Sequence, residues 1–324
     1  MSSPPDLSIV IPVYDAADTV SSLVQSIVEI EDIATQIILV DDLSTDGSRE
    51  VIGELAREHA DVTALFHEVN RGAGHARNTG FDIATGTYVL FFDADDVLHA
   101  EALRAALREL DRTAADLAMT PYHYRRTSRQ NYEAMNAFDA EIWNDIKAGE
   151  SGPVVSLREC AQLLQFSAYP WNKVLRTARY RATGLAFGST PVHNDVLGHW
   201  MSLLFARSIV LVDDELCTHI VESDGSNLTN QHSRVRLTLI EALDETYDLL
   251  SSDTTMLRRY SHQYWGFALR TASWALARVD DGLKDEFKAR FDDHLMRMRV
   301  TDYRRMRLAR TPGTADAILR TALR

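Results

Sequence analysis

Residues 87–96 read TYVLFFDADD, an apolar run that ends abruptly in three carboxylates. An apolar run of this length is typical of a strand that is buried on both faces of a sheet. In open parallel sheets, ligands bind outside the carboxyl ends of the strands, which is where Asp93 and Asp95 would lie. Because converging carboxylates repel one another, this pair indicates a cation or hydrogen-bond donors nearby.

Three similar apolar runs precede this one, at residues 7–13, 36–40 and 62–66, and amphipathic stretches separate them. This alternation predicts βαβ units and a mainly parallel sheet covered by helices on both faces. A further strand is expected at residues 116–121. Residues 125–155 are polar and are expected to form an irregular excursion outside the core.

The last quarter of the chain has a different pattern. From about residue 232 to 308, apolar residues recur at helical spacing, and a turn-rich stretch at residues 224–230 precedes them. We therefore expect an α/β domain followed by a helical C-terminal region. The expected units are a catalytic domain at 1–228, with halves at 1–115 and 116–228, and the helical region at 229–324.

Composition excludes several classes of protein. The chain of 324 residues has a net charge of −13, which argues against general nucleic-acid binding. It has no run of about 18 apolar residues, its first residues do not resemble a secretion signal, and its two cysteines form no disulfide framework. These features predict a cytoplasmic protein, with peripheral contact at the inner face of the membrane as an option.

Four motifs then carry a resemblance. They are SIVIPVYD at 8–15, LVDDLSTDGS at 39–48, NRGAGHARNTG at 70–80 and FFDADD at 91–96. In this order and spacing they resemble the family 2 glycosyltransferases, which are inverting enzymes with a GT-A fold that use nucleotide sugars. The resemblance continues through WNK at 171–173 and GLAF at 184–187 to HNDV at 193–196, so it covers about residues 7–228.

The resemblance implies a role for each matching residue on the donor side. Asp42 would accept a hydrogen bond from the base, which favours uracil because its ring N–H is a donor. Asp95 would bind Mn²⁺ or Mg²⁺, and Asp93 would contact the metal, the ribose or a metal-bound water. The other expected donor contacts are Pro12, Tyr14 and Asp15 at the base, Asn70 and Arg77 at the ribose and diphosphate, and Ala94.

On the acceptor side, Asp195 matches the family's general base. The family often has Glu where this chain has Asn194, so the neighbouring charge is lost while the catalytic position is kept. The alternative for Asp195 is an ordinary helix N-cap. Trp171, Lys173 and Asn194 are expected to contact the acceptor, although Trp171 is equally suited to the core and Lys173 to a solvated rim. His219 is a weaker candidate near the diphosphate.

The expected activity is therefore metal-dependent, inverting transfer of a sugar from a UDP-sugar to a hydroxyl of a cell-envelope polymer or other glycan acceptor. Two alternatives remain open. The first is a phosphatase, because Asp93 and Asp95 also resemble the nucleophile motif of haloacid-dehalogenase-type phosphatases. The second is a protein that binds a nucleotide sugar without catalysis. A dinucleotide site is weaker, because Arg77 stands where its third glycine is required.

Charge is distributed unevenly along the chain. Residues 1–100 hold 18 Asp and Glu against 4 Lys and Arg, whereas residues 297–324 hold 8 Arg and 2 Asp. Residues 297–310 mix Arg with Met, Tyr and Leu, a pattern that suits an anionic membrane surface, an anionic acceptor, an oligomer interface or packing on the chain's own helices. A segment at 226–229 stands where the family has a mobile loop over the donor.

Overall fold

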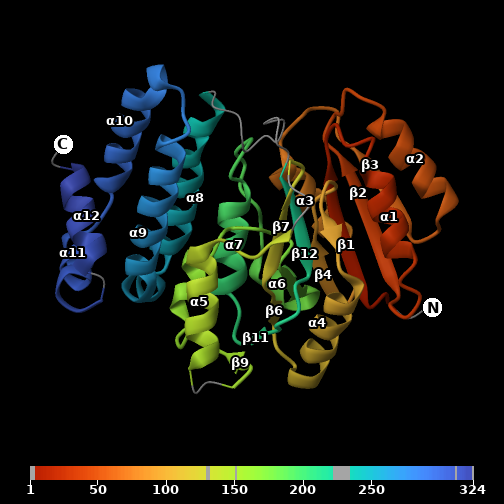
Figure 1. The fold of residues 1–324 in the computed structure, drawn as a ribbon, viewed down its shortest axis with the longest axis horizontal. Helices are drawn as coiled ribbons and strands as arrows, with labels where there is room; N and C mark the ends of the chain where they lie inside the picture. The colour runs from red at the N-terminus through yellow and green to blue at the C-terminus, as the bar shows by residue number, and fades with distance from the viewer. Residues whose placement is uncertain (1–3, 129–131, 150–151, 222–233, 311, 323–324) are drawn as a thin grey trace.

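The computed structural model describes residues 4–128, 132–149, 152–221, 234–310 and 312–322. An α/β portion built on two sheets lies beside a helical region (Figure 1). The expected boundary at 224–230 and the segment at 226–229 lie outside the described residues, so the proposed division of the chain stays a prediction.

A mostly parallel sheet forms the centre of the α/β portion, which confirms the expected fold class. β1, β2, β3 and β4 run parallel to one another, and β10 runs antiparallel to both of its neighbours. The strand order is β3 (Val62–Phe66), β2 (Thr35–Asp41), β1 (Leu7–Val13), β4 (Tyr88–Phe91), β10 (Lys173–Arg176), β6 (Leu117–Met119), β11 (Ile209–Leu211) and β9 (Val154–Val155).

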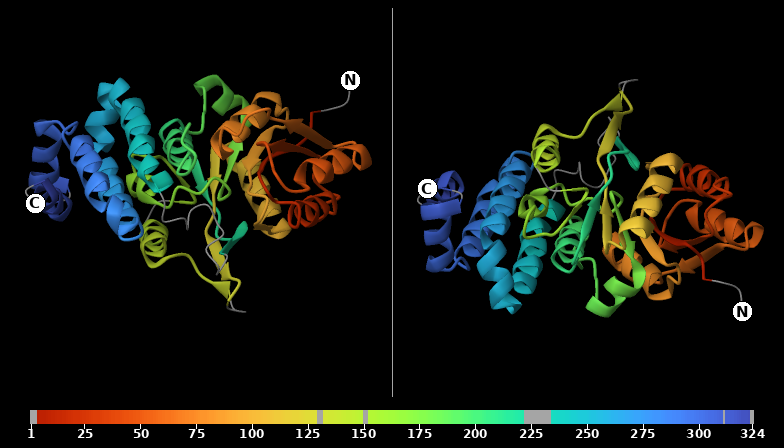
Figure 2. Two further views of the ribbon diagram at one scale, coloured as in Figure 1. Left: turned by 90° about the horizontal axis from the view of Figure 1, so that it is seen from above. Right: turned by 90° about the horizontal axis from the view of Figure 1, so that it is seen from below.

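Helices cover both faces of this sheet (Figure 2). α1 (Val20–Val28) and α4 (Ala100–Thr113) lie on one face, where Arg104 of α4 bonds Asp32 beyond the end of α1. α3 (Ala73–Ile83) and α6 (Thr177–Thr183) lie on the other, where Arg181 donates to the carbonyl of Ala84 at 2.6 Å. α2 (Ser48–Glu58) packs beside β3. With both faces covered, the central strands are almost wholly apolar and buried.

A second, smaller sheet borders the carboxyl ends of the central strands. Its order is β5 (Val97–Leu98), β12 (Cys217–Val221), β7 (Tyr122–Arg126) and β8 (Tyr132–Glu133). β5 begins directly after Asp96, and β12 carries His219. This sheet therefore places residues far apart in the sequence beside the aspartate cluster.

The expectation of an irregular excursion at 125–155 was wrong. The segment contains β8, β9 and the helix α5 (Ala137–Ala148). The helix begins after Asn136, whose side chain accepts from the backbone N–H of Asp139 at 2.9 Å. Ile142, Trp143 and Ile146 are buried on one side of α5. Three buried apolar residues among many polar ones make a weak periodic signal, and only packing against the core reveals the helix.

The helical pattern expected after residue 232 is confirmed from residue 234 onwards. Trp200 of α7 (Asp195–Leu204) meets Tyr264 and Phe267 of α9, with ring centroids 5.4 and 5.8 Å apart, so this region packs directly against the α/β portion. Its helices are α8 (Thr238–Ser252), α9 (Thr254–Leu276), α10 (Lys284–Leu295), α11 (Val300–Arg305) and α12 (Pro312–Ala322). Among the described residues, none of the helices combines the length and apolar character needed to cross a membrane.

Part of the basic C-terminal stretch is neutralised within the helical region. Arg297 bonds Asp244 at 2.7 Å and also bonds Asp248, and Arg305 bonds Asp302 at 3.0 Å. These pairs favour the alternative in which the stretch packs on the chain's own helices. Met296 and Leu308 are 83% and 82% exposed, so the surface also presents apolar side chains among the arginines.

Candidate active site

Three neighbouring parallel strands end at one edge of the main sheet. β1, β2 and β4 end at Val13, Asp41 and Phe91, so the polar residues that follow them lie along the same edge. The motif residues that the sequence singled out therefore converge, as expected of a ligand site in an open parallel sheet.

The turn after β1 is shaped by Asp15. Its backbone has a φ of 48°, in the left-handed region that residues other than glycine rarely adopt. Its carboxylate accepts from the backbone N–H of Thr45 at 2.6 Å, which joins the ends of β1 and β2. Tyr14 is 40% exposed beside it, and Pro12 is half-buried. Tyr14 is thus available to a ligand, whereas Asp15 holds the turn.

Asp42 fixes the glycine-rich loop. It is 2% exposed, and it bonds the Nδ1 of His67 at 2.7 Å and accepts from the backbone N–H groups of Arg71 at 3.0 Å and Gly72 at 2.6 Å. Both oxygens of the carboxylate already have protein partners. Any bond to a nucleotide base would be added to these. Asn70, just before them in the loop, is exposed.

Arg77 joins two motifs that are far apart in the sequence. Its two terminal nitrogens donate to Asp93 at 2.6 Å and to Asn194 at 2.8 Å, and the guanidinium lies 5.2 Å from the ring centre of Phe187. The residue is only 5% exposed. Arg77 would reach a diphosphate only by exchanging these bonds, so in this structure it positions Asp93 and Asn194.

The two remaining aspartates of the cluster differ in their surroundings. The side chain of Asp95 is accessible to solvent although much protein surrounds it, and desolvation together with the charges of Asp96 and Asp93 raises its pKa to about 7. Asp96 is buried and accepts from the backbone N–H of Ile220 at 2.8 Å. Ala94, which separates Asp93 from Asp95 in the sequence, is buried.

His219 forms an ion pair with Asp96. Its Nδ1 lies 2.9 Å from the Asp96 carboxylate. Burial opposes the protonation of His219, but the charge of Asp96 outweighs it and raises the pKa of the imidazole to about 9. His219 thus supplies a positive charge next to the aspartate cluster, whereas the sequence indicated only an approach to the diphosphate.

Asp195 is the first residue of α7 and faces the same site. Burial raises the pKa of its carboxyl to about 6. The charge of Arg77 lowers this pKa, and the charge of Asp93 raises it. Asn194, rather than Asp195, occupies the cap position of the helix, so the N-cap alternative was wrong by one residue. His193 has a φ of 62°, and such strain is often concentrated where a functional group must be aimed.

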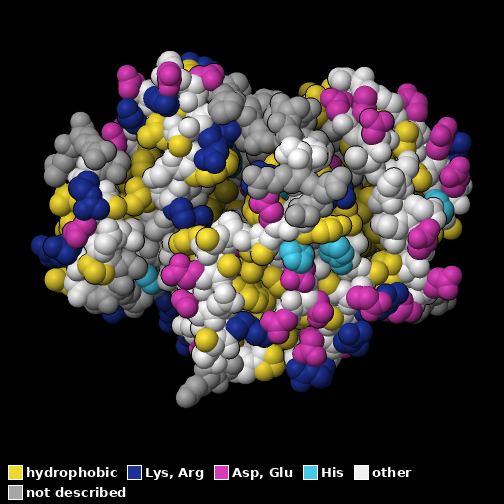
Figure 3. Space-filling model, viewed as in Figure 1, with side chains coloured by type: hydrophobic (Ala, Val, Ile, Leu, Met, Phe, Trp, Pro, Cys, Tyr) yellow, Lys and Arg dark blue, Asp and Glu magenta, His cyan; other side chains and the backbone are white. Residues whose placement is uncertain are grey.

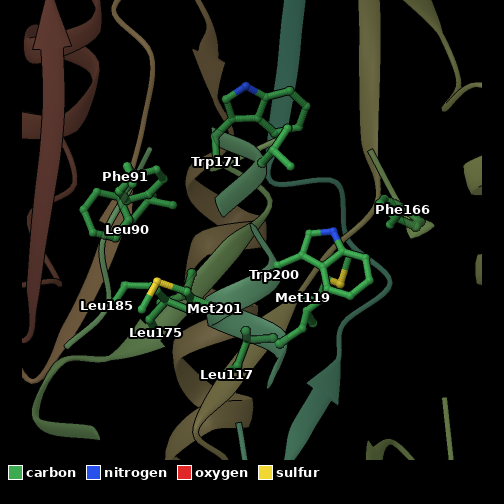
Figure 4. Packing of buried hydrophobic residues seen from close by; sticks show 14 of the residues in the cluster. Leu90, Phe91, Leu117, Met119, Phe166, Trp171, Leu175, Leu185, Trp200 and Met201 are labelled. Atoms are coloured by element: carbon green, nitrogen blue, oxygen red, sulfur yellow. The ribbon is translucent and has the colours of Figure 1, made fainter. Parts of the chain in front are cut away.

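Two of the expected acceptor contacts lie inside the protein. Trp171 is 0% exposed and stacks on Tyr169, with ring centroids 4.4 Å apart, and Figure 4 shows it among the core side chains. Lys173 is 2% exposed, and its ammonium donates to the carbonyl of Tyr169 and to Asn172, both at 2.6 Å. Both side chains are buried, which favours the core alternative for Trp171 and argues against a solvated rim position for Lys173.

The carboxylate oxygens at this site fit a hard divalent cation that is bound by few protein ligands. No group of three or more His, Cys, Asp or Glu side chains arranged to hold a metal occurs among the residues that the structure describes. Mg²⁺ and Mn²⁺ commonly bind through one or two carboxylates and complete their shell with water and substrate phosphates. Asp95 and Asp93 can supply those carboxylates. Desolvation, followed by the charges of Asp96 and Asp93, raises the pKa of Asp95 to about 7, and a bound cation would oppose that shift.

Gly74 allows α3 to approach the segment that contains Gly188 and Asn194. A Cβ at this position would lie 2.1 Å from the carbonyl oxygen of Gly188. We expect Gly74→Ala to lower the free energy of unfolding by roughly 1–3 kcal/mol, because backbone must move to make room. Thermal denaturation measures this. Gly282→Ala is the matched control, since nothing lies within 4 Å of its added Cβ, and an equal effect in both variants would contradict the explanation.

Several contributors to the site were not assigned from the sequence. Asp96 follows Asp93 and Asp95 at the end of the same strand, so its position in the sequence could have indicated that it belongs to the site. His67, which orients Asp42, gave no such signal, because a lone histidine has no distinguishing pattern. The bonds of Arg77 to Asp93 and Asn194 join three separate motifs, and only the fold brings these together.

Comparison with known proteins gives the family. Residues 8–169, half of the chain, match the model of a family described as "Glycosyl transferase family 2". A poly(ribitol-phosphate) beta-glucosyltransferase of Bacillus spizizenii is 41% identical over 102 residues, which are 30% of this chain and 16% of that protein. In two further curated relatives the match spans 28% and 32% of their length, so the chain covers a third or less of these proteins.

Solved structures show the same fold over nearly the whole chain. TarS 1-349 of S. aureus, in complex with UDP-GlcNAc, has a TM-score of 0.74 at 18% identity, covering 98% of this chain and 89% of that one. The mannosyltransferase PcManGT of Pyrobaculum calidifontis, in complex with GDP-Man and Mn²⁺, has a TM-score of 0.58 at 17% identity, covering 99% and 87%.

Proposed function

The chain belongs to glycosyl transferase family 2 and is a glycosyltransferase, and from that premise we propose how it acts. It transfers a sugar from a UDP-sugar to a hydroxyl of a cell-envelope polymer or glycan, with inversion at the anomeric carbon and with Asp195 as general base. Family membership removes the phosphatase alternative. The observation that carries the proposal is that Arg77 places Asp195's neighbour Asn194 beside Asp93, so base and donor carboxylates share one site.

The protein's own groups account for the proton transfer. The oxygen of the acceptor hydroxyl attacks the anomeric carbon from the face opposite the diphosphate, and its proton passes to the carboxylate of Asp195. The bond from the anomeric carbon to the diphosphate oxygen breaks, and UDP leaves with the electron pair. One displacement inverts the anomeric centre. A base with a pKa near 6 is deprotonated at neutral pH and still accepts a proton readily.

Asp95 and Asp93 would hold Mg²⁺ or Mn²⁺ in this proposal. When bound, the ion neutralises charge on the departing diphosphate. The Asp93 carboxylate keeps its bond to Arg77, which orients it, and the paired His219 and Asp96 lie behind the cluster. A relative in complex with Mn²⁺ supports the metal, and the accessible position of Asp95 suits a ligand shared with substrate.

Support for donor and acceptor comes from the similar proteins. TarS is in complex with UDP-GlcNAc, which favours a UDP-sugar, and a relative named for poly(ribitol-phosphate) favours a polymer acceptor. Thermal denaturation with Mn²⁺ and UDP, GDP, CDP or dTDP tests the donor. We expect UDP to raise the melting temperature most, and stabilisation by GDP but not UDP would contradict the uracil assignment.

The raised pKa of Asp195 predicts the pH dependence. Because the base must be deprotonated, we expect kcat/KM to fall as the pH decreases through about 6. Lys173, whose pKa burial lowers to about 7, is mostly protonated at that pH and favours the charged form of Asp195. Lys173→Met should therefore move the acidic limb to higher pH.

A pH series of kcat/KM between 5 and 8 measures this effect. Lys288→Met is the matched control, because its side chain is 56% exposed and lies on α10. Its profile should coincide with that of the unaltered protein. An unshifted limb in Lys173→Met would show that the two buried charges are not coupled.

A further inference from the structure

The segment before Asp195 folds back on itself as a closed loop. The backbone N–H of Gly188 donates to the carbonyl of Asn194 at 2.7 Å, and the side chain of Asn194 donates to the carbonyl of Thr190 at 3.2 Å. We call residues 188–194 the base loop, because α7 and Asp195 follow it directly. The conformation of the base loop therefore sets the position of the Asp195 backbone.

One set of contacts to the base loop comes from the α/β portion. Arg77 of α3 donates to the side chain of Asn194 at 2.8 Å. Asn78, the next residue, exchanges two hydrogen bonds of 2.8 and 3.1 Å with the backbone of Phe187, which precedes the loop. The helix that carries the glycine-rich motif thus supports the loop directly.

A second set of contacts comes from the helical region. The carboxylate of Glu245 on α8 accepts from the hydroxyl of Ser189 and from its backbone N–H, the latter at 3.3 Å. A Cβ at Gly188 would lie only 2.7 Å from one oxygen of this carboxylate. Near the other end of the loop, Trp274 of α9 meets the ring of His193 edge-on, with ring centroids 6.3 Å apart. The helical region therefore contacts the base loop near both of its ends.

The partner of Glu245 distinguishes it from its neighbours on α8. Glu241 bonds Arg290 of α10 at 3.4 Å, and Asp244 bonds Arg297 just after α10 at 2.7 Å. Lys and Arg side chains also gather over the upper part of the α8–α9 region (Figure 3). Among the residues that the structure describes, however, no ion pair includes Glu245, and its carboxylate is bonded by the base loop instead. Hydrogen bonds to a charged acceptor are stronger than neutral ones, so this contact is suited to fix the loop.

The backbone of His193 is held in an uncommon conformation. Its φ of 62° lies in the left-handed region, which residues other than glycine rarely adopt and which persists where surrounding contacts maintain it. The packing of Trp274 against the His193 ring is one such contact. Since His193 stands two residues before Asp195, relaxation of this backbone would move the carboxylate as well.

We propose that Glu245 and Trp274 are positioning residues, which hold the base loop so that Asp195 meets the attacking hydroxyl. The proposal rests on the proposed function for the role of Asp195. It gives the helical C-terminal region a part in the reaction, although neither residue touches a reacting atom. Misplacing a reacting group by about 1 Å can lower a rate constant roughly 10²-fold, whereas donor contacts made elsewhere stay intact.

Hydrolysis of a UDP-sugar in Mn²⁺, with water as the acceptor, tests the proposal. UDP release is measured with whichever of UDP-GlcNAc, UDP-glucose and UDP-galactose the unaltered protein hydrolyses fastest. We expect Glu245→Ala to lower kcat roughly tenfold, while KM for the donor stays within about twofold. Glu245→Gln should retain most of kcat, because its amide can accept from the backbone N–H of Ser189 and donate to the hydroxyl. Glu241→Ala is the matched control on the same helix, since its side chain is 55% exposed and bonds Arg290, and its kcat should be unaltered.

Hydrogen exchange, followed by mass spectrometry, measures the base loop without any ligand. In Glu245→Ala and in Trp274→Ala, the amides of residues 188–196 should exchange about fivefold faster or more, while those of the central strands stay unchanged. Trp274→Phe keeps a ring beside His193 and should exchange like the unaltered protein.

Unaltered exchange in both alanine variants would overturn the positioning role, and so would a loss of kcat that Glu241→Ala shares. Asp195→Asn is assayed in parallel. If it is inactive while Glu245→Ala has full kcat, the positioning role fails and the base assignment stands. If it retains turnover while Glu245→Ala loses kcat and exchanges faster, the base assignment fails and the support of the loop by the helical region stands. Absence of turnover with all three donors would contradict the proposed function, and the exchange rates then decide the support of the loop by themselves.

Discussion

Asp195→Asn is expected to lower the rate of sugar transfer by roughly 10²- to 10⁴-fold, the usual contribution of a general base. Asparagine has nearly the same shape but cannot accept the proton of the acceptor hydroxyl. The substitution leaves the bonds of Arg77 to Asn194 and Asp93 in place, so the donor side should keep its geometry. Removing a carboxylate whose pKa burial raises should not destabilise the fold.

Single-turnover transfer and UDP-induced thermal stabilisation separate the two effects. Transfer should be lost while the melting-temperature shift with UDP and Mn²⁺ stays unchanged. Asp292→Asn, an exposed substitution on α10, is the control for the loss of one carboxylate. Near-normal transfer by Asp195→Asn would remove this residue from the base role.

Asp95→Asn is expected to abolish the metal-dependent part of UDP binding and to lower transfer by roughly 10²-fold or more, since a donor held without its ion loses charge stabilisation in the transition state. The free energy of unfolding of the unliganded protein, in contrast, should stay the same or increase. The folded-state pKa of Asp95 is raised to about 7, so its charged form opposes folding once the pH exceeds the unfolded value and does so fully above 7.

Thermal denaturation at pH 8, with and without Mn²⁺ and UDP, tests both parts. Without ligands, Asp95→Asn should melt at the same temperature as the unaltered protein or higher, and adding Mn²⁺ with UDP should no longer stabilise it. Asp292→Asn again serves as the control and should keep the ligand response. A variant that is less stable without ligands but still stabilised by Mn²⁺ and UDP would show that Asp95 is structural.

Local pattern predicted most of the α/β portion because strands and helices leave short periodic signals in the sequence. The apolar runs of β1, β2 and β4 are largely buried and stand out without any knowledge of the fold. The weak periodicity of α5 did not stand out, because most of its stabilisation comes from the core that it covers.

The sequence by itself determined the fold class, the order of the motifs and the aspartates at the strand ends, since each of these depends on residues close together in the chain. Tertiary structure decided what those residues contact. Arg77 bonds Asn194 across 117 positions, His219 pairs with Asp96 across 123, and Trp171 and Lys173 are enclosed by the core. Charge pairing, burial and the pKa values that follow from them depend on distances in space, which neither composition nor spacing encodes.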